Sequence, residues 1–172
     1  MHASGAWHGA WHPGRHLRPP PGKHAVRPGH ARVTIARMDI AALQALHDEI
    51  FAPWVRELEL VVRSTTADSV TLALPVLPRH VHGGGVVCGQ TLMAAADTAL
   101  VLAISHKLGG FRPQTTVQLQ TSFLRAVGQD VPEVAITATV LKAGRSLVFG
   151  EVELRLPDGQ LAAQATSTSA LL

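Results

Sequence analysis

The sequence predicts an α+β fold, in which a curved antiparallel β-sheet wraps around one long central α-helix and an extra helix precedes the sheet. Two observations carry this prediction. Residues 89–107 form the single long apolar segment without alternation. Six β-rich segments, two before it and four after it, are joined within each group by short turns. Strands joined by short turns pair antiparallel, and one face of such a sheet must be covered. A chain of 172 residues is expected to form one domain of this kind.

The first elements are predicted to be a helix and a β-hairpin. Between Ile40 and Phe51 apolar residues recur mostly at steps of three to four, Asp39 suits the N-cap, and Pro53 is expected to end the helix. The stretch 58–76 is rich in β-formers on both sides of the turn residues 66–68, and its second half alternates.

The central helix is predicted over residues 89–107. Gly109 and Gly110 suit its C-terminus, and Pro113 cannot continue it. Because the segment is apolar on every side, we expect it to be enclosed. Four further strands are expected within residues 115–126, 133–144, 145–156 and 160–172.

Residues 1–37 differ from the rest in composition. They are rich in His, Pro, Gly and Arg without any helical or strand period, which predicts a disordered tail before a single domain over 38–172. This tail holds six Lys or Arg and no acid, whereas residues 38–172 hold nine basic and twelve acidic residues. The basic character therefore comes from the tail, and we expect the domain to bind no nucleic acid. The six tail histidines lack the spacing of a metal site, so no metal or cofactor is expected.

Cysteine content and hydropathy suggest a cytoplasmic protein. The lone Cys88 cannot form an intrachain disulfide, and no apolar h-region of a signal peptide stands near the N-terminus. The longest apolar run, residues 92–104, is shorter than the roughly 20 residues needed to cross a bilayer, and it contains Asp97. We therefore expect no membrane partner.

Asp97 is the unusual residue of the central helix. It lies eight residues after Gly89, too far inside the helix for an N-cap, and an unpaired buried charge would cost several kcal/mol. One interpretation is structural: a hydroxyl of Thr98 or of a strand threonine satisfies the carboxylate, which holds subunits in register. The other is catalytic, because carboxylates in such settings often mark functional sites.

Gly89 has the character of an anion or oxyanion site. A first-turn N–H has no intrahelical acceptor, and glycine allows a ligand close to the backbone. Gly89 and Asp97 are separated by roughly 12 Å along the helix axis, too far for one small reacting group. If two central helices run antiparallel across a two-fold axis, Gly89 of one approaches Asp97 of the other, which gives two equivalent sites in a homodimer.

The segment 80–100 resembles the signature of hotdog-fold acyl-CoA thioesterases of the PaaI-like (phenylacetic-acid-degradation) group. That signature is Asn-x-x-Gly-x-x-His-Gly-Gly, followed by an apolar helix with a catalytic Asp nine residues after the His. The visible His-Gly-Gly at 82–84 does not fit, because Asp97 follows it by fifteen residues. Counting nine back from Asp97 instead places the motif on His82 for Asn, Gly85 for the first Gly, and Cys88, Gly89 and Gln90 for His-Gly-Gly.

The resemblance extends over residues 55–172 and implies hydrolysis of acyl-CoA by a homodimer or a dimer of dimers. Asp97 would be the general base or the nucleophile, the Gly89 N–H would stabilise the oxyanion, and Thr116 would orient water or Asp97. Arginine suits bidentate phosphate recognition, so two arginines are candidates for CoA phosphates. The expected substrate-binding residues are His82, Gly85, Cys88, Gln90, Arg125 and Arg145.

Several alternatives stay open at this point. Cys88 at a helix N-terminus could be a nucleophile paired with His80 or His82, although a small buried residue fits better. The same histidines and the glycine run could form a metal site with few ligands or a phosphate-binding loop. On the same fold the chain could be an acyl-thioester hydratase or dehydratase, which would usually need a histidine beside the carboxylate. From another class, it could be a catalytically silent acyl-CoA-binding or assembly protein.

Overall fold

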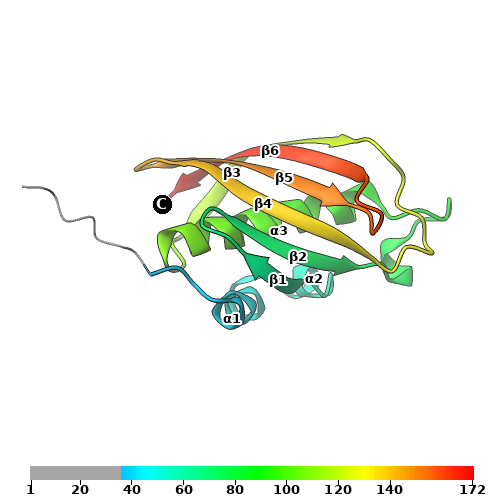
Figure 1. Ribbon diagram of the computed structural model, residues 1–172, viewed down its shortest axis with the longest axis horizontal. Helices are drawn as coiled ribbons and strands as arrows, with labels where there is room; N and C mark the ends of the chain where they lie inside the picture. Colours follow the sequence, from blue (N-terminus) through cyan, green and yellow to red (C-terminus); the bar gives the residue numbers. More distant parts are fainter. Residues whose placement is uncertain (1–35) are drawn as a thin grey trace, which may run out of the picture. The chain divides into compact units, whose positions relative to one another are not determined.

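The computed structural model describes residues 36–172. The predicted disordered tail over residues 1–37 lies outside the described residues, apart from its last two. Among the described residues, a pair of helices precedes the sheet, a long helix stands in its middle, and every strand pairs antiparallel (Figure 1). The elements are α1 (Ile40–Ile50), α2 (Pro53–Arg56), β1 (Val61–Thr65), β2 (Ser69–Pro75), the 3₁₀ turn η1 (Pro78–His80), α3 (Gly89–Leu108), β3 (Gln114–Phe123), β4 (Glu133–Ala143), β5 (Leu147–Arg155) and β6 (Leu161–Leu171).

The six strands form one sheet in the order β1-β2-β4-β5-β6-β3, curved around α3. Alternate residues of β4, β5 and β6 are buried against the helix, which is the period expected of strands with one covered face. The core between sheet and helix contains Leu72, Leu100, Ile136 and Leu154, all 0–1 % exposed. The predicted fold, a hotdog arrangement with an additional N-terminal helix, is confirmed.

The helix α3 begins and ends as its sequence predicts. Cys88 is the N-cap in extended conformation, and Gly109 closes the helix in the left-handed region at φ 75°, donating to the carbonyls of Ser105 and His106. The expectation that the sheet encloses the helix on every side is wrong in one respect. A stripe with Gln90, Met93 and Asp97 keeps some exposure, and Met93 is 37 % exposed. One face of α3 is therefore left uncovered by residues 36–172.

The two edges of the sheet differ. At the β1 edge, Gln44 of α1 donates to the carbonyl of Leu60 and accepts from the N–H of Val62 at 2.9 Å, so the helix occupies two backbone groups at the start of that edge. At the other edge, β3 is ten residues long and has only β6 as a neighbour, and Val117 on it is 62 % exposed. Among the described residues nothing covers the β3 edge.

A short helix, α2, was not predicted from the sequence. Pro53 ends α1, as expected, but it also occupies the first turn of α2, where its missing N–H costs nothing. Val55 of α2 and Leu58 after it are buried, which brings this segment against the first turns of α3. The segment matters because it walls a cavity beside Gly89.

Polar contacts attach the C-terminal end of α3 to the rest of the domain. His106 is 2 % exposed, and its ring nitrogens lie 2.8 Å from the carbonyl oxygens of Met38 and Thr66. Lys107 donates to Asp68 in the β1–β2 turn, and this hydrogen bond is the main cause that lowers the pKa of the Asp68 carboxyl. The end of α3 is thus tied both to the hairpin and to the segment before α1.

The lowered pKa of Asp68 makes a fraction of the stability depend on pH. Because the folded state binds this proton less readily than the unfolded state, the contribution is present above the ordinary aspartate range, near pH 4, and is lost as the pH falls through the folded-state value. We expect the melting temperature of Asp68→Asn to fall less than that of the wild type between about pH 6 and pH 3. Thermal unfolding followed by circular dichroism measures this, with the exposed Asp130→Asn as the control. Parallel curves for wild type and Asp68→Asn would contradict the assignment.

Candidate active site

Asp97 and Thr116 form a hydrogen-bonded pair of side chains on the uncovered face of α3. The hydroxyl of Thr116 donates to Oδ1 of Asp97 at 2.7 Å, and both residues are half-buried. The other carboxylate oxygen receives no hydrogen bond from residues 36–172. Thr98, the other hydroxyl considered from the sequence, donates to the carbonyl of Ala94 instead. Asp97 is therefore held through one oxygen and leaves the second for a water molecule or a substrate.

A β-bulge brings Thr116 to the helix. The register of β3 against β6 shifts between Thr116 and Gln118, so that Thr116 pairs with the buried Ser169 while Gln118 pairs with Thr168. The extra residue, Val117, is left outside the ladder and is highly exposed. As a result Thr116 and Phe123 both lie on the face of the sheet that covers α3, although they are an odd number of residues apart.

Gly89 provides the positive end of the helix. It is the first residue of α3, and its N–H has no acceptor among the described residues. A Cβ atom at this position would lie 3.2 Å from the ring of Phe123. The sequence argument that glycine leaves room for a ligand thus needs correction, because the space beside Cα is taken by Phe123, which is itself 49 % exposed. The N–H remains available along the helix axis.

Asp97 and Gly89 do not meet within one chain. Both belong to the straight helix α3 and are eight residues apart, which corresponds to roughly 12 Å along its axis. A single copy therefore contains a carboxylate with its hydroxyl partner at one place and an oxyanion donor at another. This agrees with the separation calculated from the sequence.

Two cavities lie at the first turns of α3. The first, which we call the β3-end cavity, has a volume of about 370 Å³ and includes Val87, Gly89, Leu92, Phe123, Arg125 and Ala126 among its walls. The second, the α2–α3 cavity, has about 320 Å³ and includes Trp54, Leu58, Arg79, His80, Gln90 and Ala94. Both volumes are in the range of small-molecule sites.

The loop 80–88 is ordered by its own hydrogen bonds. Gly85 adopts φ 76°, where only glycine is unstrained, and donates to the carbonyl of His82. The ring of His82 is exposed and accepts from the N–H of Gly84 at 2.9 Å. The expected substrate-binding roles of His82 and Gly85 therefore have a competing conformational explanation, which is that both residues shape this turn.

His80 does not form a metal or phosphate site with His82. It is 3 % exposed, and its Nδ1 lies 3.0 Å from the carbonyl oxygen of Pro75 and 3.4 Å from the N–H of Leu77. Its buried Nε2 has no hydrogen-bond partner among the described residues. Within residues 36–172 no group of three His, Cys, Asp or Glu residues is arranged to hold a metal ion.

Cys88 and Gln90 lie on either side of Gly89. Cys88 is half-buried, its N–H donates to the carbonyl of His80 at 2.8 Å, and its thiol makes no hydrogen bond to either nearby imidazole in the described region of the chain. The nucleophile interpretation of Cys88 thus lacks its base. Gln90 is exposed on the first turn of α3, where it lines the α2–α3 cavity.

Arg125 and Arg145 lie at opposite ends of the sheet. Arg125 follows β3, borders the β3-end cavity and donates to the carbonyl of Leu161 at 2.9 Å. Arg145 belongs to the β4–β5 turn, next to Ser146, which accepts from Leu171 at the far end of β6. The length of β6 therefore separates the two arginines within one chain, and their assignment to CoA phosphates stays a prediction.

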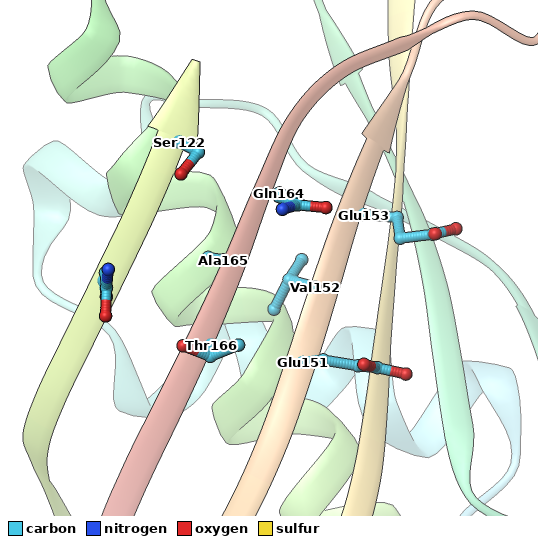
Figure 2. A pocket seen from close by; sticks show the side chains of 8 residues that line it. Ser122, Glu151, Val152, Glu153, Gln164, Ala165 and Thr166 are labelled. Atoms are coloured by element: carbon cyan, nitrogen blue, oxygen red, sulfur yellow. The ribbon is translucent and has the colours of Figure 1, made fainter. Parts of the chain in front are cut away.

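A further hollow of about 420 Å³ lies on the outer face of the sheet (Figure 2). Polar side chains of three neighbouring strands line it in two cross-strand rows. None of Gly89, Asp97 or Thr116 borders it, so it does not belong to the site around α3. The rows are Ser122–Gln164–Glu153 and Gln120–Thr166–Glu151.

The helix α3 also meets the length and hydropathy criteria of a membrane span, although the sequence predicted too short an apolar run. This is weak evidence, because the core helix of a globular domain passes the same test, and 61 % of the relevant window is buried inside the fold. Its neighbours in the structure are strands of the sheet.

Sequence reasoning missed Phe123, Trp54 and the free nitrogen of His80. A period of two along β3 would have assigned Phe123 to the face opposite Thr116, because a bulge leaves no mark in the pattern. Trp54 precedes the sheet on a helix of four residues that has no periodic signal. The environment of His80 depends on contacts with residues five positions away.

Comparison with known proteins identifies the family. The model of the thioesterase superfamily matches residues 80–163, which include the loop before α3, the whole of α3 and most of the strands after it. Comparison with curated proteins gives no match. A solved structure of a conserved Pseudomonas aeruginosa protein is 30 % identical, with a TM-score of 0.65, and the match covers 73 % of this chain and 98 % of that one. The chain belongs to the thioesterase superfamily.

Two further solved structures share the fold. Zebrafish thioesterase superfamily member 2 is 27 % identical over 77 % of this chain and 95 % of its own, with a TM-score of 0.66. The Escherichia coli PaaI protein from the phenylacetic acid degradation operon is 17 % identical over 75 % of this chain and 89 % of its own, with a TM-score of 0.65. At that identity the likeness to PaaI concerns the fold alone.

Proposed function

We propose that this protein is a PaaI-like acyl-CoA thioesterase, which hydrolyses the thioester to a free acid and CoA. The observation that supports it most is the hydrogen bond from Thr116 to Asp97 on the uncovered face of α3, in a chain of the thioesterase superfamily. A half-buried carboxylate with one oxygen held and the other open is suited to activate a water molecule.

In the proposed reaction Asp97 acts on the thioester carbonyl that the Gly89 N–H polarises. As a general base, the carboxylate removes a proton while the water oxygen bonds to the carbonyl carbon, and the oxyanion is stabilised at the helix N-terminus. The C–S bond then breaks, and the CoA sulfur leaves with the proton that Asp97 had taken. As a nucleophile, Asp97 would first form a mixed anhydride, which water then hydrolyses.

The separation of Gly89 and Asp97 supports a homodimer. The open β3 edge and the uncovered stripe of α3 adjoin each other, and antiparallel pairing of two β3 strands would satisfy the edge hydrogen bonds. Such a two-fold axis places two α3 helices antiparallel, so that Gly89 of one copy approaches Asp97 of the other. A dimer of dimers remains a further prediction, for which Leu147 and Phe149, exposed on the outer face, offer apolar surface.

The same symmetry gives the two arginines a shared role. Antiparallel pairing reverses the direction of the second sheet, so that Arg145 of the second copy lies at the end where Arg125 of the first copy borders the β3-end cavity. Arg125 has no carboxylate partner among the described residues. We assign these guanidinium groups to the CoA phosphates.

The alternatives have less support. A hydratase or dehydratase usually needs a histidine beside the carboxylate, and none of the imidazoles within residues 36–172 hydrogen-bonds to Asp97. A silent acyl-CoA-binding protein would not need the hydrogen bond between Thr116 and Asp97. We propose a cytoplasmic location with no nucleic-acid or membrane partner.

The proposal is tested with purified full-length protein and a panel of short, aryl and medium-chain acyl-CoA thioesters, with the released thiol measured. Hydrolysis of at least one member in the typical range of about 1–10³ s⁻¹ is expected. A parallel assay with enoyl-CoA substrates detects hydration. If no thioester is hydrolysed but CoA binds, the silent binder replaces the thioesterase; hydration without hydrolysis would favour the hydratase.

A further inference from the structure

The positions of the two cavities raise the question of which one receives the acyl group and which one receives the CoA arm. A thioester carbonyl bound at the Gly89 N–H has two substituents, the acyl group and the CoA sulfur, and one cavity includes Gly89 while another includes its neighbour Gln90. The β3-end cavity contains Gly89 itself, and the α2–α3 cavity contains the adjacent Gln90 and His80, whose carbonyl accepts from Cys88. Each substituent therefore has one cavity within reach.

The charges of the two cavities differ. Arg79 at the α2–α3 cavity is paired with Glu59 at 2.6 Å and donates twice to the carbonyl of Glu57. The Glu57 carboxylate also lies at this rim, which therefore carries no excess positive charge. Arg125 at the β3-end cavity binds only a neutral carbonyl within the described residues. Phosphate groups are attracted to the unneutralised arginine and repelled by an acidic rim.

The walls of the α2–α3 cavity suit an acyl group. Leu58 and the small side chains of Thr91 and Ala94 leave apolar space, and Trp54, 61 % exposed, supplies a flat aromatic wall. The buried His80 adds one polar atom. Its Nδ1 lies 3.0 Å from the carbonyl oxygen of Pro75 and 3.4 Å from the N–H of Leu77, whereas its Nε2 has no hydrogen-bond partner among the described residues.

We infer that the acyl group occupies the α2–α3 cavity, with Trp54 and Ala94 setting its size and the unpartnered His80 Nε2 favouring acyl groups that carry a hydroxyl, while the pantetheine arm leaves along the β3-end cavity toward Arg125. The inference rests on the proposed thioesterase function. It adds to that function the orientation of the bound thioester and a class of substrate, the hydroxylated acyl groups. A buried polar atom without a hydrogen-bond partner is unfavourable, and a substrate hydroxyl would supply that partner.

Matched substitutions in the two cavities test the direction. Ala94→Leu fills the α2–α3 cavity, and Ala126→Leu fills the β3-end cavity with the same added volume. We expect Ala94→Leu to lower kcat/KM for long acyl-CoA at least about tenfold relative to acetyl-CoA. Ala126→Leu and Arg125→Ala should instead lower the ratio of kcat/KM for acyl-CoA to that for acyl-pantetheine. An exchange of these two effects would overturn the inference.

The hydroxyl preference is tested with hexanoyl-CoA and ω-hydroxyhexanoyl-CoA. We expect wild type to prefer the hydroxylated substrate severalfold, and His80→Asn to lose the preference. The asparagine amide can still donate to Pro75 but has no group in place of Nε2. Equal preference in both proteins would remove His80 from the acyl site.

Binding measurements separate this inference from the proposed function. Calorimetry with non-hydrolysable S-alkyl-CoA thioethers of increasing length does not depend on catalysis. If the wild type hydrolyses nothing but Ala94→Leu selectively weakens long thioethers, the thioesterase proposal fails and the acyl site stands. The opposite outcome is that hydrolysis is normal while Ala94→Leu leaves the chain-length preference unchanged and Ala126→Leu leaves the ratio of acyl-CoA to acyl-pantetheine activity unchanged. In that case the acyl site fails and the thioesterase stands.

Discussion

Replacing Asp97 with asparagine is expected to lower kcat about 10²- to 10⁴-fold, because the amide can neither accept a proton nor attack the thioester. Asparagine has the same shape, and its carbonyl oxygen can still accept from Thr116 at the position of Oδ1. The substitution should therefore leave the fold intact. Thiol release measures the loss, and circular dichroism with thermal unfolding verifies the fold.

A second variant checks the same pair. Thr116→Val removes the hydroxyl without changing the side-chain shape, and it should cost about tenfold in kcat, since a hydrogen bond to a charged group contributes about 1.5 kcal/mol or more. If Asp97→Asn is folded and fully active, the carboxylate is structural and holds the uncovered face of α3 in register, as the alternative interpretation requires.

Isotope labelling then distinguishes the two roles of Asp97. In a single turnover in H₂¹⁸O, a general base gives an acid labelled from the water in the first turnover. A nucleophile whose anhydride is opened by water at the Asp97 carboxyl carbon transfers one of its own carboxylate oxygens to the first product and retains the label in the protein.

Substitution of Gly89 by proline should have the second large effect. Proline removes the N–H that we assign to the oxyanion, yet it is accepted at the first position of a helix, and Cys88 before it already has the extended conformation that proline requires (φ −59°, ψ 138°). A loss of about 10²- to 10³-fold in kcat is expected, as for other oxyanion donors.

Gly89→Ala is the matched control for the proline variant. It introduces the same Cβ atom, which obliges the Phe123 ring 3.2 Å away to move by a few tenths of an ångström, but it keeps the N–H. Activity of the alanine variant should stay close to that of the wild type. If both variants lose activity equally, the loss comes from Phe123 and not from the N–H.

Mixed dimers show whether the two groups belong to different chains. When Asp97→Asn and Gly89→Pro chains are unfolded and refolded together in equal amounts, half of the dimers combine both, and each of these has one intact site. About a quarter of wild-type activity should return. No recovery, with mixed dimers demonstrated by two different tags, would place the whole site within one chain.

Local patterns were sufficient for much of the fold. Gly89 to Leu108 formed the one long helix because its apolar run is bounded by a glycine at each end, and the strands followed the turn residues between them. The helix α2 escaped prediction because four residues carry no period, and its formation depends on burial of Val55 beneath it. The composition of α3 did not show which of its faces the sheet leaves open, since apolar residues occur all round the helix.

The sequence by itself determined the spacing of Gly89 and Asp97, since the rise of a helix converts eight residues into a distance. It also determined the family motif and the antiparallel order of the elements. Only the tertiary structure decided that Thr116 reaches Asp97, that Phe123 covers Gly89, and that Arg125 and Arg145 lie at opposite ends. These facts depend on strand register, a bulge and side-chain packing between distant segments, and each is set by the free energy of the whole fold rather than by any local pattern.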